Sequence, residues 1–397
     1  MSSSNKIYEM EILSDPVFVT NLEKDVYNMV GTFSKTTLID LKADKGLNYL
    51  RNDISINGTS TVVNNLGDAE YTLSVSSPND SCSLVSKERG SYLAGKAAEI
   101  GIAMRLPIPL QSSQTLKWGY FNDIDGVYFL KTNNKFYVCI MRDGVETKFE
   151  QSQFNRDRMD GTTGSYKILN FADGNIFRIN FSWYGYGAIQ FSVLGTDLSG
   201  SQKLLPLHVF QTVGQTSTKH PCLPLSVKLN YGTTFSSPTT VFITGRQYSI
   251  LGSFNSIYRL NGIYSLNKIC PINIFTPLLT IQKDTYHTDF KVNLNDILIH
   301  SSQNTYIEIR SLTTLTNSTF TTISNSESCI EYDTTSDTVT LGTILWCGII
   351  PQNLPTKIDF NNTINLDIQQ ITVCGKSLHQ TEPSTLSYIH LNWKEEW

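Results

Sequence analysis

The chain has 397 residues, a length beyond that at which single hydrophobic cores usually stop growing, so two or three domains are expected. Its formal net charge is −4 and no Lys/Arg cluster is present, which argues against direct nucleic-acid binding. No stretch approaches 18 uninterrupted apolar residues, and the N-terminus lacks the apolar core of a signal peptide. Neither a membrane span nor the usual secretion route is therefore expected.

The composition favours β structure. Hydrophobic residues make up 40% of the chain, whereas charged residues make up only 17%. Ser, Thr and Asn, which are poor helix formers, take the place of the missing charge. In the first ninety residues, Glu23 to Val30 predicts a short helix and Thr61 to Ser76 predicts a strand and turn.

The middle of the chain shows the period of two that is typical of half-buried strands. A three-strand meander is predicted over 127–130, 136–141 and 145–149. In the run 176–183 every second residue is Phe, Ile or Trp, and a return run over 189–193 alternates in the same way. Because Tyr-Gly-Tyr-Gly separates these two runs, they predict an antiparallel hairpin.

Similar alternation continues to the C-terminus. Leu225, Val227 and Leu229 close a predicted central sandwich, and Ser236-Ser237-Pro238 marks a boundary after it. Further alternating runs occur at 306–312, 364–368 and 389–393. The expected fold is all-β, with two or more antiparallel, jelly-roll-like β-sandwich domains in tandem. The expected divisions are an N-terminal β-rich segment (1–90), a central jelly-roll-like sandwich (91–235) and a C-terminal sandwich (236–397).

Two motifs resemble ligand loops but fail in detail. Residues 90–97 have the G-x-x-x-x-G-K spacing of a phosphate-binding loop, yet Ala97 stands where a Ser or Thr hydroxyl must reach Mg²⁺. Residues 122–126 (Asn-Asp-Ile-Asp-Gly) resemble the start of a calcium loop, but the bidentate Glu expected further on is absent. An Asx-rich turn is the favoured interpretation, with a structural cation as the alternative.

No residue pattern predicts an active site. Asp157 and Asp160, with Asp143, Glu146 and Glu150 nearby, could form the carboxylate pair of a glycosidase, but a solvated loop is favoured. The six histidines and seven cysteines are scattered, without metal-ligand spacing or a C-x-x-C pair. We expect buried thiols in a reducing compartment, and no catalytic, cofactor-binding or metal-ligating residue is predicted.

Several segments occur in a fixed order between Gly90 and Trp397. They are SYLAGK (91–96), WGYFNDIDGVYF (118–129), FNRDRMDG (154–161), WYGYG (183–187), the stretch 312–334 and LNWKE (391–395). In this order they resemble a family of virion structural and fibre-like minor capsid proteins of tailed phages and large double-stranded DNA viruses. Its "GYFDDNDGVFF" and "WNxDxxDG" elements are similar to the second and third segments, although Phe154 stands where the family has Trp. The first ninety residues match no element of it.

The resemblance implies a virion role and supplies no catalytic residues. We therefore expect a non-enzymatic capsid, vertex or fibre component, made and assembled in the host cytoplasm. Its partners would be other capsid proteins and copies of itself as a trimer or pentamer. One alternative is a carbohydrate- or receptor-binding module for a host surface glycan, in which Tyr184, Tyr186 or Tyr231 stacks on sugar rings. A glycoside hydrolase is the less favoured alternative.

Overall fold

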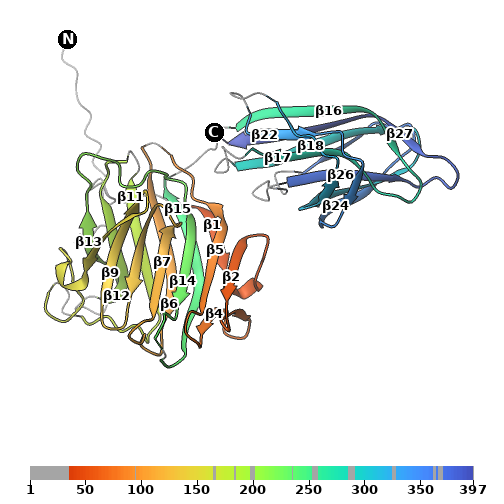
Figure 1. Ribbon diagram of the computed structural model, residues 1–397. Coiled ribbons are helices and arrows are strands. Elements are labelled where there is room, and N and C mark those ends of the chain that lie inside the picture. Colours follow the sequence, from red (N-terminus) through yellow and green to blue (C-terminus); the bar gives the residue numbers. More distant parts are fainter. Residues whose placement is uncertain are drawn as a thin grey trace, which may run out of the picture. The chain divides into compact units, whose positions relative to one another are not determined.

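A computed structural model shows an almost entirely β protein (Figure 1). It describes residues 35–93, 95–163, 167–182, 185–196, 202–234, 236–252, 258–284, 291–323, 328–360, 364 and 370–396. These residues form 27 strands and two short 3-10 helices, η1 (Ala43–Lys45) and η2 (Gln151–Gln153). The all-β prediction is confirmed, whereas the helix predicted over 23–30 lies outside the described residues. Within the described ranges no helix is long and apolar enough to cross a bilayer.

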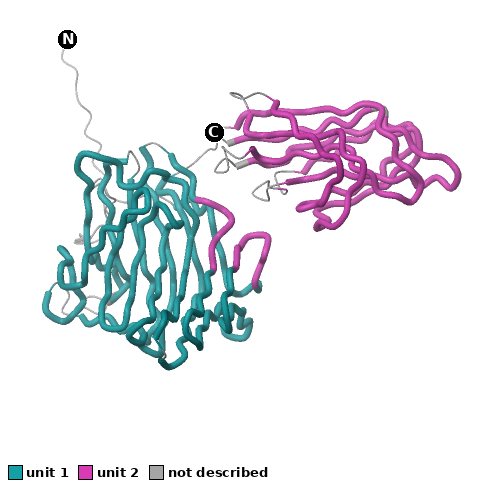
Figure 2. The backbone as a smooth tube through the Cα atoms, viewed as in Figure 1, with its two compact units in different colours: residues 1–46, 55–83, 90–253 teal, residues 47–54, 84–89, 254–397 magenta. Residues whose placement is uncertain are grey.

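The chain divides into two compact units (Figure 2). The first comprises residues 1–46, 55–83 and 90–253, and the second comprises residues 47–54, 84–89 and 254–397.

An eight-stranded antiparallel sheet forms one layer of the first unit. Seven of its strands run in the order β13-β12-β11-β6-β15-β4-β3, and β1 also pairs with β15. The strands are β1 (Lys35–Lys42), β3 (Thr61–Asn65), β4 (Glu70–Val75), β6 (Ala97–Arg105), β11 (Asn175–Ser182), β12 (Ile189–Thr196), β13 (Gln202–Phe210) and β15 (Thr239–Leu251).

A seven-stranded sheet runs in the order β10-β9-β8-β7-β14-β5-β2. The strands are β2 (Asn52–Asn57), β5 (Ser81–Arg89), β7 (Thr115–Phe121), β8 (Gly126–Lys131), β9 (Phe136–Arg142), β10 (Val145–Glu150) and β14 (Pro224–Asn230). The meander predicted over 127–149 is β8-β9-β10, and its pairing is antiparallel as expected.

Aromatic rings from the two sheets meet in the core between them. Trp118 of β7 is fully buried and lies 5.0 Å, centroid to centroid, from Phe177 of β11. Phe129 of β8 lies 5.4 Å from Phe191 of β12. These contacts place the apolar residues of β11 and β12 on the inner face, and the two strands pair as the predicted hairpin.

The second unit also contains two antiparallel sheets around one core, which includes Ile307, Ile389 and Trp393. One sheet has the order β16-β27-β18-β25, from β16 (Tyr258–Cys270), β18 (Lys291–Ser301), β25 (Thr356–Asp359) and β27 (Ser384–Glu396). The other has the order β21-β22-β17-β26-β19-β24, from β17 (Thr276–Lys283), β19 (Thr305–Ser311), β21 (Thr321–Thr322), β22 (Ile330–Asp333), β24 (Thr343–Ile350) and β26 (Gln370–Ser377). A small pair joins β20 (Thr314–Thr316) to β23 (Thr338–Thr340).

The two units differ from the divisions expected at 90/91 and 235/236. Strands β1, β3 and β4, from the expected N-terminal segment, lie in the same sheet as β6 and β11. Strand β15 begins after the expected second boundary and yet pairs with β1, β4 and β6. A turn signal such as Ser236-Ser237-Pro238 marks a loop, but it does not say whether the next strand returns to the same sheet.

Candidate functional site

The outer face of the eight-stranded sheet is polar. Burial shows which residues of this sheet face inward. Phe177 and Ile179 of β11 pair with Ile102 and Ile100 of β6, and all four are buried in the core. Because side chains alternate along a strand, the residues between them point away from the core. We call these outward side chains the polar face; they are Glu99, Arg178, Asn180, Gln190, Ser192, Gln247 and Ser249.

Strand register aligns the polar face in two rows. In the first row Ser249, Glu99, Asn180 and Gln190 lie side by side on β15, β6, β11 and β12. In the second row Gln247, Gly101, Arg178 and Ser192 occupy the same four strands. Residues opposite each other on neighbouring strands have Cβ atoms about 5 Å apart, so the first row is a continuous line of polar groups, whereas Gly101 interrupts the second row.

Glu99 is the only carboxylate of this set, and two cations hold it. The Lys35 ammonium donates to Oε1 at 2.8 Å and to Oε2 at 2.9 Å, and Arg178 Nη1 donates to Oε2 at 3.2 Å. The Glu99 side chain is 3% exposed, whereas those of Lys35 and Arg178 are 34% and 24% exposed. Arg178 contacts Glu99 through Nη1, so its other N–H groups can reach a ligand from the open side.

Asn180 carries an acceptor that none of the described residues uses. Its Oδ1 atom is buried and, among the described residues, has no hydrogen-bond partner. Burying an acceptor without a partner costs about 1–3 kcal/mol, so such an atom in a native protein calls for a water or ligand donor. Its neighbours in the row, Glu99 and Gln190, place this acceptor at the middle of the polar face.

Gly101 leaves a notch in the second row. A Cβ atom built on Gly101 would lie 3.9 Å from the nearest atoms of Gln247 and would meet nothing closer. The glycine is therefore not required for close packing, and its effect is an open space between Gln247 and Arg178. A ligand can approach the sheet backbone there.

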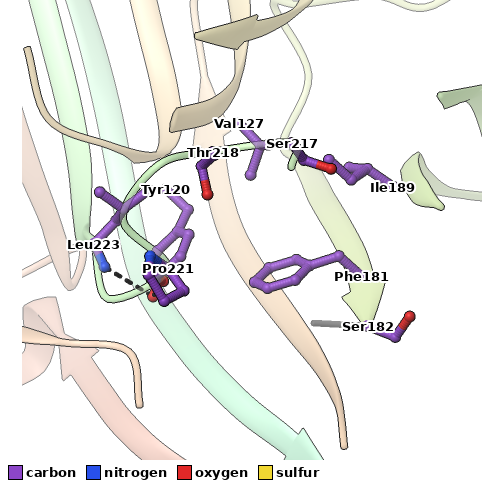
Figure 3. A pocket seen from close by; sticks show the side chains of 9 residues that line it. All are labelled: Tyr120, Val127, Phe181, Ser182, Ile189, Ser217, Thr218, Pro221 and Leu223. Atoms are coloured by element: carbon purple, nitrogen blue, oxygen red, sulfur yellow. Dashed lines mark hydrogen bonds between the residues drawn. The ribbon is translucent and has the colours of Figure 1, made fainter. Parts of the chain in front are cut away.

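The first unit also contains a small cavity under the loop that joins β13 to β14 (Figure 3). The rings of Tyr120 and Phe181 stack 5.8 Å apart along it, and Ser217 and Thr218 bring hydroxyl groups to its wall. The Thr218 hydroxyl has no partner among the described residues. The volume is about 10 Å³, which is room for about one water molecule and too little for a sugar ring.

Asp125 holds the β13–β14 loop in place through a hydrogen bond from Lys219, and it belongs to the motif at 122–126. Asn122 Oδ1 accepts hydrogen bonds from the backbone N–H groups of Ile124 and Asp125, which is the favoured Asx turn. Asp125 is fully buried, and its Oδ1 accepts from the N–H groups of Lys219 at 2.7 Å and Asp143 at 3.3 Å. In the described ranges no group of three or more His, Cys, Asp or Glu could hold a metal ion.

The carboxylates considered for a glycosidase have separate structural partners. Asp157 Oδ1 accepts from the N–H of Met159, and Asp160 Oδ1 accepts from the N–H of Thr162. Asp143, Glu146 and Glu150 form ion pairs with lysines on the seven-stranded sheet and its loops. Burial alone would raise the pKa of Glu146, but hydrogen bonds from Tyr128 and Lys117 outweigh it and lower that pKa. None of these contacts joins two of the five carboxylates.

Lys96 is followed by strand β6 rather than by the helix that a phosphate-binding loop needs. Tyr231 is fully buried and so cannot stack on a sugar, Tyr186 is 58% exposed, and Tyr184 lies outside the described residues. All seven cysteines are free and five of them are buried, as expected.

No family model and no curated protein matches the chain. Among solved structures it is similar to an endo-β-1,4-glucuronan lyase from the fungus Trichoderma reesei, with 11% identity, 55% of this chain and 97% of that chain covered, and a TM-score of 0.36. It is also similar to a β-1,3-glucanase from Mycobacterium marinum, with 8% identity, 54% of this chain and 99% of that chain covered, and a TM-score of 0.38. A third similar structure is the carbohydrate recognition domain of Emp47p, with 14% identity, 55% of this chain and 97% of that chain covered, and a TM-score of 0.34. TM-scores this low carry no argument about what this chain binds or does.

Proposed function

We propose that this chain is a carbohydrate-binding β-sandwich protein whose polar face holds the sugar. The observation that carries the proposal is the unpartnered Asn180 Oδ1 in the row between Glu99 and Gln190. A sugar hydroxyl bound there would donate to Asn180 Oδ1 once the amide turns outward, because this atom is buried in the unbound protein, and it would accept from a neighbouring N–H. This pairing would satisfy the one buried acceptor on the polar face that the protein leaves open.

The chemistry of the polar face suits hydroxyl groups. Each hydroxyl is one donor and two acceptors, and the amides of Asn180, Gln190 and Gln247 offer both kinds of group within one side chain. The guanidinium of Arg178 adds donors, and the missing side chain at Gly101 lets a ligand come closer to the sheet backbone. A few fixed polar groups of this kind orient a ligand and give specificity.

The proposed role is binding without bond cleavage. A glycosidase needs one carboxylic acid that gives up a proton and a second carboxylate across the bond. Both oxygens of Glu99 instead accept hydrogen bonds from Lys35 and Arg178. Glu99 therefore acts in this proposal as the anchor that positions the two cations.

The test is a glycan array probed with the full chain, followed by titration calorimetry on any glycan that binds. Loss of one charged hydrogen bond in Arg178→Ala is expected to weaken binding by about tenfold or more. Lys148→Ala, on the seven-stranded sheet, is the matched control and leaves the affinity unchanged. Absence of reproducible glycan binding, or equal affinity for Arg178→Ala and the unaltered chain, would refute the proposal.

A virion structural role is the second candidate and is compatible with glycan binding by a receptor-binding fibre. A specific feature of the second unit favours it: the exposed large apolar residues on β16 include Leu260, Tyr264 and Leu266, which is the character of a protein contact surface. Electron cryo-microscopy of an intact particle would test it. Density for this chain at a defined position relative to the symmetry axes is the expected result, and a particle without the chain would contradict it.

A further inference from the structure

Strand β16 presents a long apolar edge in the second unit. It spans 13 residues and ends the described order of its sheet, with β27 on one side only. Ile263 packs against the core, so the residues that alternate with it point outward. We call Tyr258, Leu260, Tyr264 and Leu266 the apolar row; their exposed fractions are 41%, 61%, 63% and 55%.

Such an edge is a template for another strand. An edge strand offers a line of N–H and C=O groups that can pair with a second chain, and proteins usually block it with proline or charge. No proline interrupts residues 258–270, and the two charged residues of β16, Arg259 and Lys268, are not part of the apolar row. The apolar row therefore adds a hydrophobic contribution to a backbone that is already able to pair.

We propose that β16 pairs antiparallel with β16 of a second copy, about a two-fold axis at Gly262. This register sets Tyr258 opposite Leu266 of the second copy and Leu260 opposite its Tyr264. Every tyrosine then meets a leucine, and an aromatic–aliphatic cross-strand pair contributes roughly 0.2–1 kcal/mol. Two-fold pairing of identical strands is isologous and closes on itself, so it yields a dimer and not a filament.

The other residues of β16 agree with this register. Arg259 would lie opposite Ser265 and Asn261 opposite Ile263, so no like charges face each other. Side chains of the neighbouring strand β27 fill the space over Gly262. A Cβ atom on Gly262 would lie 2.3 Å from Asn392 Oδ1 and 2.9 Å from His390 Nε2. At the two-fold axis the two copies of Gly262 face each other, so no β16 side chain stands between the apolar rows of the two copies.

The size of the contact predicts a reversible dimer. Burying the apolar row would remove roughly 400 Å² per copy, or on the order of 800 Å² in total, which is below the roughly 1,200 Å² of stable specific interfaces and is typical of a weak, transient contact. We therefore expect a weak dimer, with a dissociation constant on the order of 100 µM. This inference does not depend on the polar face, because it concerns residues 258–266 alone.

Sedimentation of the full chain from about 1 to about 100 µM tests the dimer. The chain is expected to shift from monomer towards dimer, whereas Leu260→Glu and Tyr264→Glu stay monomeric with an unchanged far-UV spectrum. Ile274→Glu, at a 64% exposed position outside β16, is the matched control and still dimerises. A chain that stays monomeric throughout, or a dimer that Leu260→Glu leaves intact, overturns the proposal.

Cross-linking tests the register separately from folding. In a Cys347→Ser background, which removes the one exposed native thiol, the double variant Leu260→Cys, Tyr264→Cys is expected to form a disulfide-linked dimer on mild oxidation. Either single variant and the pair Tyr258→Cys, Leu260→Cys should not, because no introduced cysteine then lies opposite another. Equal cross-linking by all of these variants would overturn the register.

Discussion

The backbone N–H of Lys219 donates a hydrogen bond of 2.7 Å to the Oδ1 atom of Asp125, although 94 residues separate the two. The same oxygen accepts from the N–H of Asp143. One buried carboxylate thus joins the β7–β8, β9–β10 and β13–β14 loops at one end of the first sandwich. Buried acceptors with two N–H donors are costly to remove, because both donors lose their partner.

Replacing Asp125 with Ala is expected to lower the free energy of unfolding by about 1–3 kcal/mol and to release the loop around Lys219. Urea denaturation measures the first effect, and faster hydrogen exchange at the Lys219 and Asp143 amides measures the second. Asp125→Asn keeps an oxygen acceptor and should lose less. Lys219→Ala keeps the backbone donor, so equal losses in Lys219→Ala and Asp125→Ala would contradict this role.

The aromatic core of the first unit should depend strongly on Trp118. Its ring lies 5.5 Å from Phe129, 6.0 Å from Phe136 and 5.0 Å from Phe177, and it is fully buried. Trp118→Ala is expected to cost about 3–5 kcal/mol of unfolding free energy, because the cavity left behind cannot fully collapse. Trp118→Phe should cost less. Chemical denaturation checks both, and a loss below about 1 kcal/mol for Trp118→Ala would argue against this packing.

Filling the notch at Gly101 should separate binding from stability. A Cβ at Gly101 meets no close contact, and a β-branched residue suits a strand, so Gly101→Val is expected to change the free energy of unfolding by less than about 1 kcal/mol. It should weaken glycan binding by about tenfold or more, a loss of about 1.4 kcal/mol or more. Gly174→Val is the control, since a Cβ there also meets nothing, and it should bind normally. Unchanged glycan affinity in Gly101→Val would place the sugar elsewhere.

Asp80 should make the first unit sensitive to acid. Burial alone would raise its pKa, but hydrogen bonds from the Thr59 hydroxyl and from backbone N–H groups of Ser76, Thr59 and Ser77 outweigh it and lower the pKa to about 2. Since the unfolded pKa is about 3.9, the stabilisation is fully present above that value and is lost as the pH falls towards about 2.

The acid effect can be measured as the difference in urea midpoint between the unaltered chain and Asp80→Asn. That difference should be largest at neutral pH and should shrink steadily below about pH 4. A difference that stays constant down to about pH 2 would show that the Asp80 charge contributes nothing.

Much of the strand content could be predicted from the sequence, because it is a local property. The alternation of Phe177, Ile179 and Phe181 marks one face of β11, and all three are buried. The same alternation shows that Arg178 and Asn180 point outward. It does not show that Glu99 and Gln190 lie beside Asn180, since that depends on register among strands distant in sequence.

The polar face and the division into two units could not be predicted from the sequence for the same reason. Lys35 reaches Glu99 across 64 residues, and no local pattern signals the pair. Tyr231 is fully buried, and its hydroxyl donates a hydrogen bond to the carbonyl of Ser236. Its ring therefore belongs to the core, although its neighbours in the sequence are typical of a loop. Burial of single aromatic residues follows from the assembled sheets and not from composition.

The pairing of β15 has a consequence for synthesis of the protein. This strand, Thr239–Leu251, lies between β6 and β4 and also pairs with β1, which precedes it by about two hundred residues in the chain. The eight-stranded sheet is therefore incomplete until residue 251 has left the ribosome, and until then the earlier strands have unpaired edges, which favour aggregation. A fragment ending at residue 235 should stay unfolded by circular dichroism, whereas one ending at residue 253 should fold.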